Sequence, residues 1–116
     1  PKPASAASDV YKRQFIQDAD LIVTGEGRLD SQSIMGKAPV AVARLAKQFQ
    51  KPVIALAGCV GPDASLCNQA GIDAFFPILR FPGPLEDALE PANASANLEA
   101  AAEQVFRLLQ TSRTLL

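Results

Sequence analysis

One segment of this chain reads Leu21-Ile22-Val23-Thr24-Gly25-Glu26-Gly27-Arg28-Leu29-Asp30-Ser31-Gln32-Ser33-Ile34-Met35-Gly36-Lys37-Ala38-Pro39. It opens with a short apolar run. The remainder combines two acids, two bases, three glycines and three hydroxyl side chains. Such a composition gives up core-forming residues for backbone freedom and charge. Because α/β sheets bind ligands in the loops after their strands, this pattern indicates a binding site.

Apolar runs on both sides of this segment predict a parallel sheet. Residues 19–24 read as a buried strand that Gly25 ends, and residues 52–57 read as a second one that Gly58 ends. Residues 73–78 read as a third strand. Pro77 lacks the amide that a strand ladder needs, so this strand is expected to be short or at an edge.

Helical patterns alternate with these strands. The helix that begins near Pro39 has apolar residues at helical spacing, namely Val42, Leu45, Ala46 and Phe49. A short helix is predicted over 62–70, capped by Gly71, and a helical turn over 85–89. A closing helix over about 92–110 has its apolar positions at Leu98, Ala102, Val105, Phe106 and Leu109.

The alternation of strands and helices predicts an α/β fold with right-handed crossovers and a parallel sheet. Three visible strands make a thin sheet, so we expect a partial domain. Residues 1–14 are largely small or polar and have no secretory apolar core, so we expect a disordered or non-native leader there. The first residue is proline, which suggests a chain that begins within a larger protein.

Composition excludes several classes of function. Lys plus Arg number 11 against 12 for Asp plus Glu, whereas a nucleic-acid binder of this size usually has a basic excess. No apolar run has the length of a bilayer span. The absence of histidine removes His-based triads and His-ligated metals. Cys59 and Cys67 are expected to be thiols of a reducing compartment, and the cytoplasm is the expected location.

Two standard nucleotide-binding motifs fail in the polar segment. Gly25 and Gly27 begin a dinucleotide fingerprint, but Asp30 stands where the third glycine belongs and would repel a pyrophosphate. Gly36-Lys37 resembles the end of a phosphate-binding loop, but Ser31 replaces its partner glycine and Ala38 follows the lysine.

The residue types nevertheless suit phosphoryl chemistry. The free amides at the helix start near Pro39 attract anions, and Lys37 adds a cation there. Arg28 is suited to a two-point contact with a carboxylate or phosphate. Asp30 or Glu26 is suited to accept a hydroxyl proton or to hold Mg²⁺.

Structural roles compete with these functional ones. Acids and bases in one loop often only pair with one another, and Asp30 or Ser31 is also suited to cap a turn. Asp63 reads as a first-turn acid of the following helix, and Arg80 as a solvated surface residue.

The run from Asp20 to Ser33, continued by Gly36-Lys37-Ala38-Pro39, resembles the signature of the bacterial glycerate kinase family. Residues 52–58, 71–74 and 85–88 also look like the C-terminal part of that family. The resemblance implies ATP-dependent phosphorylation of glycerate to phosphoglycerate. It also implies a two-domain enzyme in which residues 15–116 complete a Rossmann-like domain and need the N-terminal and inserted-domain segments.

The resemblance further assigns roles to residues of the polar segment. It implies catalytic roles for Asp30, Arg28 and Lys37, with Asp30 also a candidate Mg²⁺ ligand. The implied substrate-binding residues are Glu26, Gly25, Gly27, Ser31, Gln32, Ser33 and Gly36. The implied small-molecule partners are glycerate and ATP, with no nucleic acid and no membrane.

Two alternatives remain open at this point. One is a non-catalytic α/β module that binds an organic acid or phosphate at the Gly36-Lys37 helix N-terminus. The other is a plain interaction domain whose loop charges only pair internally.

Overall fold

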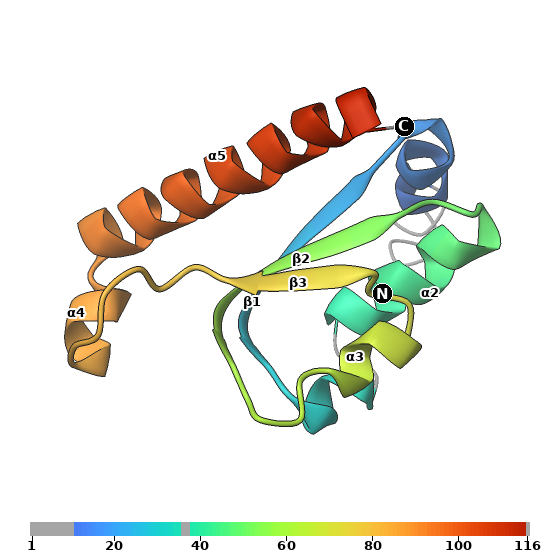
Figure 1. Ribbon diagram of the computed structural model, residues 1–116. Coiled ribbons are helices and arrows are strands. Elements are labelled where there is room, and N and C mark those ends of the chain that lie inside the picture. Colours follow the sequence, from blue (N-terminus) through green and yellow to red (C-terminus); the bar gives the residue numbers. More distant parts are fainter. Residues whose placement is uncertain (1–10, 36–37, 116) are drawn as a thin grey trace.

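The computed structural model describes residues 11–35 and 38–115. Three strands, β1 (Ile22–Leu29), β2 (Val53–Val60) and β3 (Ala74–Pro77), form one parallel sheet in the order β1-β2-β3 (Figure 1). This confirms the predicted α/β fold. The helical elements are residues 11–18, the 3₁₀ helix η1 (Ser31–Ile34), α2 (Ala38–Gln48), α3 (Leu66–Gln69), α4 (Leu85–Leu89) and α5 (Pro91–Leu115).

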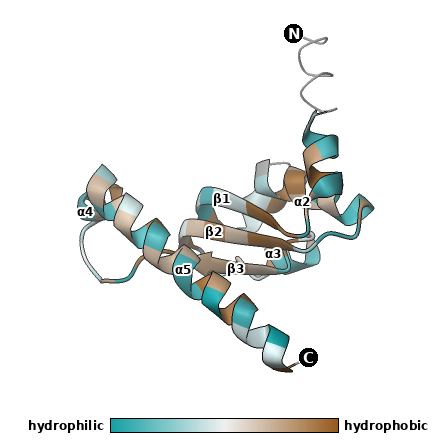
Figure 2. Cartoon of the chain, turned by 90° about the horizontal axis from the view of Figure 1, so that it is seen from above, coloured by the Kyte–Doolittle hydropathy of each residue, from teal (hydrophilic) through white to brown (hydrophobic). Residues whose placement is uncertain are grey.

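Helices cover both faces of the sheet, as a parallel sheet requires. Helices α2 and α3 lie on one face and α5 crosses the other (Figures 1 and 2). Alternate side chains of β2 point into the two layers. Val53, Ala55 and Ala57 pack with the α2 and α3 side. Ile54 and Leu56 pack with Val105 of α5.

Strands β1 and β2 are longer than predicted, because their glycines continue the strands instead of ending them. β1 runs through Gly25 and Gly27 to Leu29, and β2 runs through Gly58 to Val60. The parallel ladder persists at the end, where Arg28 pairs with Cys59. A glycine within a strand is typical where another backbone comes close. The third strand is short and lies at the edge, as predicted.

The helices differ from prediction mainly at their ends. The helix expected over 62–70 is confined to Leu66–Gln69, because residues 61–66 form successive turns. Gly71 takes the left-handed conformation expected of its capping role, with φ of 105°. Helix α5 continues to Leu115, and Leu98 and Phe106, two of the apolar positions named for it, are nearly half exposed.

The N-terminal boundary also differs from prediction. Residues 11–14 are helical, as part of the helix over 11–18, and not disordered. Ile16 in this helix is buried in the core. Among the described residues, none of the helices is both long enough and apolar enough to cross a membrane.

Asp73 joins three elements at the amino end of the sheet. Its Oδ2 accepts a hydrogen bond of 2.8 Å from the buried amide of Val53 and forms an ion pair with Lys47 of α2. Partial burial raises the pKa of Asp73, but the Lys47 ammonium and the Val53 amide outweigh it, so the net pKa lies below its usual value. The ionised carboxylate therefore stabilises the fold.

We expect Asp73→Ala to destabilise the protein by about 1–3 kcal/mol at pH 7, because it leaves the Val53 amide unpaired. Asp73→Asn keeps an acceptor and should cost less. Since the folded pKa is lowered, the stabilisation is present above the unfolded pKa and is lost as the pH falls through the folded one. Urea unfolding between pH 7 and pH 3 should show the gap between wild type and Asp73→Asn closing at acid pH, and a constant gap would contradict this.

Candidate functional site

The polar segment at the carboxyl end of β1 is organised around an ion pair between Arg28 and Asp30. The Nε of Arg28 donates to Oδ2 of Asp30 at 3.1 Å. The Arg28 side chain is about half exposed, whereas the Asp30 side chain is 18% exposed. Arg28 therefore presents N–H groups to solvent while Asp30 holds its orientation.

Asp30 is also the N-cap of η1. Its Oδ1 accepts from the amide of Gln32 at 2.9 Å, and its own amide donates to Oγ of Ser33 at 3.2 Å. The Asp30 side chain also accepts from the amide of Ser33, and this bond and the one to the Ser33 hydroxyl form a reciprocal capping box. Ser33 is fully buried. The structural role weighed for Asp30 is thus present, and Ser33 serves the turn and does not face solvent.

The end of β2 lies directly against this ion pair. The amide of Gly61 donates to the carbonyl of Leu29 at 2.7 Å. A β-carbon built on Gly61 would lie 3.1 Å from Nη2 of Arg28 and from Cβ of Asp30. The same point lies 3.2 Å from Oδ1 of Asp63. A glycine at position 61 therefore leaves room beside all three side chains.

Sequence reasoning missed the place of Asp63. It was expected in the first turn of a helix, but α3 begins at Leu66 and has no acid in its first turn. The Ser31 hydroxyl is the main cause that lowers the pKa of the Asp63 carboxyl; burial opposes this, and the Ser31 amide and the Arg28 charge add to it. The one feature of the sequence that could have indicated this place is that Asp63 closely follows the predicted strand over 52–57.

Two thiols border the ion pair. Nη1 of Arg28 lies 3.8 Å from Sγ of Cys59, and Sγ of Cys67 lies 3.7 Å from the carbonyl oxygen of Asp30. Cys67 is fully buried. Burial, followed by the charges of Asp30 and Asp63, raises the pKa of this thiol. It therefore stays protonated and acts as a packing residue.

The other predicted site residues differ in how exposed they are. Glu26 is half-buried on the same strand face as Arg28, and its Oε1 accepts from the amide of Gly27 at 3.1 Å. Gly25, Gly27 and Gln32 are exposed, and Ser31 is half-buried. Gly36 and Lys37 lie outside the described residues.

The carboxylates near the ion pair suit Mg²⁺ only if substrate phosphates supply further ligands. Within residues 11–35 and 38–115, no group of three or more acidic, cysteine or histidine side chains is placed to hold a metal ion. Mg²⁺ is usually held by one or two carboxylates together with substrate phosphates. Asp30 and Asp63, which flank Gly61, fit such a site.

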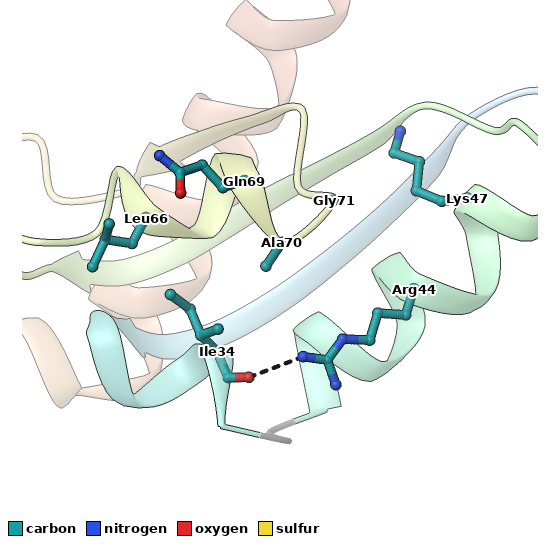
Figure 3. A pocket seen from close by; sticks show the side chains of 7 residues that line it. All are labelled: Ile34, Arg44, Lys47, Leu66, Gln69, Ala70 and Gly71. Carbon is teal, nitrogen blue, oxygen red and sulfur yellow. Dashed lines mark hydrogen bonds between the residues drawn. The ribbon is translucent and has the colours of Figure 1, made fainter.

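Two hollows lie away from the ion pair. One, of about 480 Å³, lies between α2 and α3, where Nη2 of Arg44 donates to the carbonyl of Ile34 at 3.3 Å (Figure 3). The other, of about 420 Å³, follows β3. There Arg80, which is exposed as expected, also donates to Oδ1 of the buried Asn97 at 2.9 Å.

The family model described as the glycerate kinase family matches residues 6–110. The chain belongs to the glycerate kinase family. The match covers the whole polar segment and every strand, so the resemblance carried by residues 20–39 is confirmed. It begins within residues 1–14, so part of the range that we expected to be non-native aligns with the family.

Individual glycerate kinases agree with this assignment. The chain is 52% identical over 95 residues to a glycerate kinase from Haemophilus influenzae, covering 82% of this chain and 25% of that protein. It is 43% identical over 101 residues to a glycerate kinase from Bacillus subtilis, covering 87% and 26%.

A solved structure agrees as well. The crystal structure of a Salmonella typhimurium LT2 protein, assigned as a glycerate kinase 2, is 39% identical with a TM-score of 0.65. The similarity covers 91% of this chain and 25% of that one. The chain thus spans about a quarter of the length of the relatives it matches.

Proposed function

We propose that this chain is part of an enzyme that transfers the terminal phosphoryl group of ATP to a hydroxyl of glycerate. The observation that carries the proposal is the family match over residues 6–110, which includes the Arg28–Asp30 site. Residues 15–116 would form the C-terminal part of a Rossmann-like domain in a two-domain, cytoplasmic enzyme. The other segments of that enzyme would complete the active site.

The geometry supports distinct roles for the two paired side chains. Arg28 is fixed through its Nε and has further N–H groups facing solvent, which suits a carboxylate or phosphate oxygen. Asp30 is held by three donors and its carboxylate keeps free acceptor capacity, which suits a hydroxyl of glycerate or Mg²⁺. Phosphoryl transfer depends largely on such positioning and charge stabilisation.

The other proposed contacts are arranged around this pair. Glu26 shares its strand face, and the backbone of Gly25 and Gly27 lets a ligand come close. Ser31 and Gln32 line the turn that Asp30 caps. Lys37, with Gly36, is proposed from sequence alone as a cation for phosphate. Mg²⁺, when bound with ATP, would neutralise charge on the phosphates.

The test is ADP release by the complete open reading frame that contains this chain. With Mg-ATP present, release should rise and saturate with glycerate and stay at background with propionate, which has the carboxylate but neither hydroxyl. Phosphorus NMR of the product would identify the phosphorylated position. A folded protein that binds Mg-ATP but releases no ADP with glycerate would refute the proposal.

A further inference from the structure

The guanidinium of Arg28 is anchored at two of its nitrogen atoms, and the second anchor is the sulfur of Cys59. Nε of Arg28 donates to Oδ2 of Asp30 at 3.1 Å, and Nη1 donates to Sγ of Cys59 at 3.8 Å. Nη2 has no hydrogen-bond partner among residues 11–35 and 38–115. Because the guanidinium is planar, one bond at Nε still lets the group turn, whereas a second bond at Nη1 fixes its plane. The direction of Nη2 is therefore fixed as well.

Strand pairing places Cys59 for this contact. Arg28 of β1 and Cys59 of β2 are partners in the parallel ladder, so their side chains leave the sheet on the same face. Next to Cys59, the two backbones come so close that a β-carbon on Gly58 would lie 2.6 Å from the carbonyl oxygen of Gly27. The distance between the sulfur and the guanidinium is thus set by the backbone of the sheet.

The surroundings of Cys59 differ from those of Cys67, the other cysteine. Cys67 is buried in the core, whereas Cys59 is half-buried and belongs to neither apolar cluster of the described residues. The bond from Arg28 is the one hydrogen bond that the Cys59 side chain makes within the part of the chain that the structure describes. The side chain of Cys59 is therefore placed to act on Arg28.

We propose that Cys59 is a positioning residue. Its sulfur, together with Asp30, holds the Arg28 guanidinium so that Nη2 stays available to an anionic oxygen of a substrate. That oxygen belongs either to the carboxylate of glycerate or to a phosphate of ATP, both of which suit an arginine. A group that is already oriented before the substrate binds loses less freedom on binding. This inference rests on the proposed kinase function.

Two substitutions at Cys59 in the complete protein separate hydrogen bonding from packing. Cys59→Val keeps a side chain of similar size and removes the acceptor, whereas Cys59→Ser keeps an acceptor. We expect Cys59→Val to raise the KM of one substrate about 3-fold to 10-fold, as the loss of one hydrogen bond would, with kcat little changed. Cys59→Ser should remain close to wild type. A raised KM for glycerate assigns the anionic oxygen to its carboxylate, and a raised KM for ATP assigns it to a phosphate.

The matched control is Thr111→Val, which also removes one side-chain hydrogen bond, on the exposed surface of α5. It should change neither KM. A second measurement does not depend on activity: ¹⁵N exchange NMR reports rotation of the Arg28 guanidinium about its Nε–Cζ bond. This rotation should be faster in Cys59→Val than in wild type, Cys59→Ser or Thr111→Val.

Either unchanged rotation or unchanged KM values in Cys59→Val would overturn the positioning role of Cys59. Equal losses in Cys59→Val and Cys59→Ser would overturn it too, because only packing would then matter. If the wild type releases no ADP with glycerate, the kinase proposal fails, and the rotation rate alone decides whether Cys59 anchors Arg28.

Discussion

Replacing Asp30 with asparagine in the complete protein is expected to lower kcat about 100-fold to 10,000-fold, the range typical of a lost general base. The same variant should keep the fold, because asparagine is as good an N-cap as aspartate. Its single side-chain oxygen can still accept from the Gln32 amide and keep the cap, while its NH₂ group cannot accept from Arg28. What the substitution removes is the negative charge and the basicity of the carboxylate.

This prediction separates the two roles of Asp30. If Asp30 only caps η1, Asp30→Asn should leave both the melting temperature and kcat near wild type. If Asp30 also acts on glycerate or Mg²⁺, kcat should fall while the melting temperature stays within a few degrees. Glu103→Gln is the control for loss of one acid, since Glu103 forms an exposed ion pair with Arg107 in α5. Steady-state kinetics with thermal melting gives both readouts, and an unchanged kcat would remove Asp30 from the mechanism.

Gly58→Ala is expected to destabilise the protein by about 1–3 kcal/mol, the usual cost of inserting atoms into a packed interior. A β-carbon at this position would lie 2.6 Å from the carbonyl oxygen of Gly27. The obstacle is backbone, so β1 and β2 would have to move apart just before Arg28 and Cys59. We therefore expect glycerate-dependent activity to fall together with stability.

Gly27→Ala is the matched control on the facing strand. A β-carbon there meets nothing within 4 Å, and the backbone is not left-handed. Urea unfolding should therefore place Gly27→Ala near wild type in stability and Gly58→Ala well below it. Equal stabilities for the two variants would contradict the close strand approach seen at Gly58.

Periodicity and apolar runs were enough to predict the class of fold. The buried runs of β1 and β2 and the proline in β3 indicated a parallel sheet with a short edge strand, and the structure agrees. The strand ends were wrong because Gly25 and Gly58 were interpreted as terminators. Single-sequence patterns do not reveal that a partner backbone approaches a glycine closely enough to exclude a side chain.

The candidate site was predictable only where its residues are contiguous. The ion pair of Arg28 with Asp30 and the capping role of Asp30 follow from neighbours in the chain, and both were among the alternatives considered. Asp63 was missed because its place beside Gly61, close to the Arg28–Asp30 pair, depends on the pairing of β1 with β2. The hydrogen bond from Arg80 to the buried Asn97 was missed for the same reason, since it joins the segment after β3 to α5.

A hybrid enzyme provides the most direct measurement of whether this chain carries working glycerate kinase residues. The matched 95 residues would replace their counterparts in the Haemophilus influenzae glycerate kinase, to which they are 52% identical. We predict glycerate-dependent ADP release by this hybrid, lost when Asp30→Asn is introduced. A folded hybrid that binds Mg-ATP but releases no ADP with glycerate would contradict the assignment of these residues to the active site.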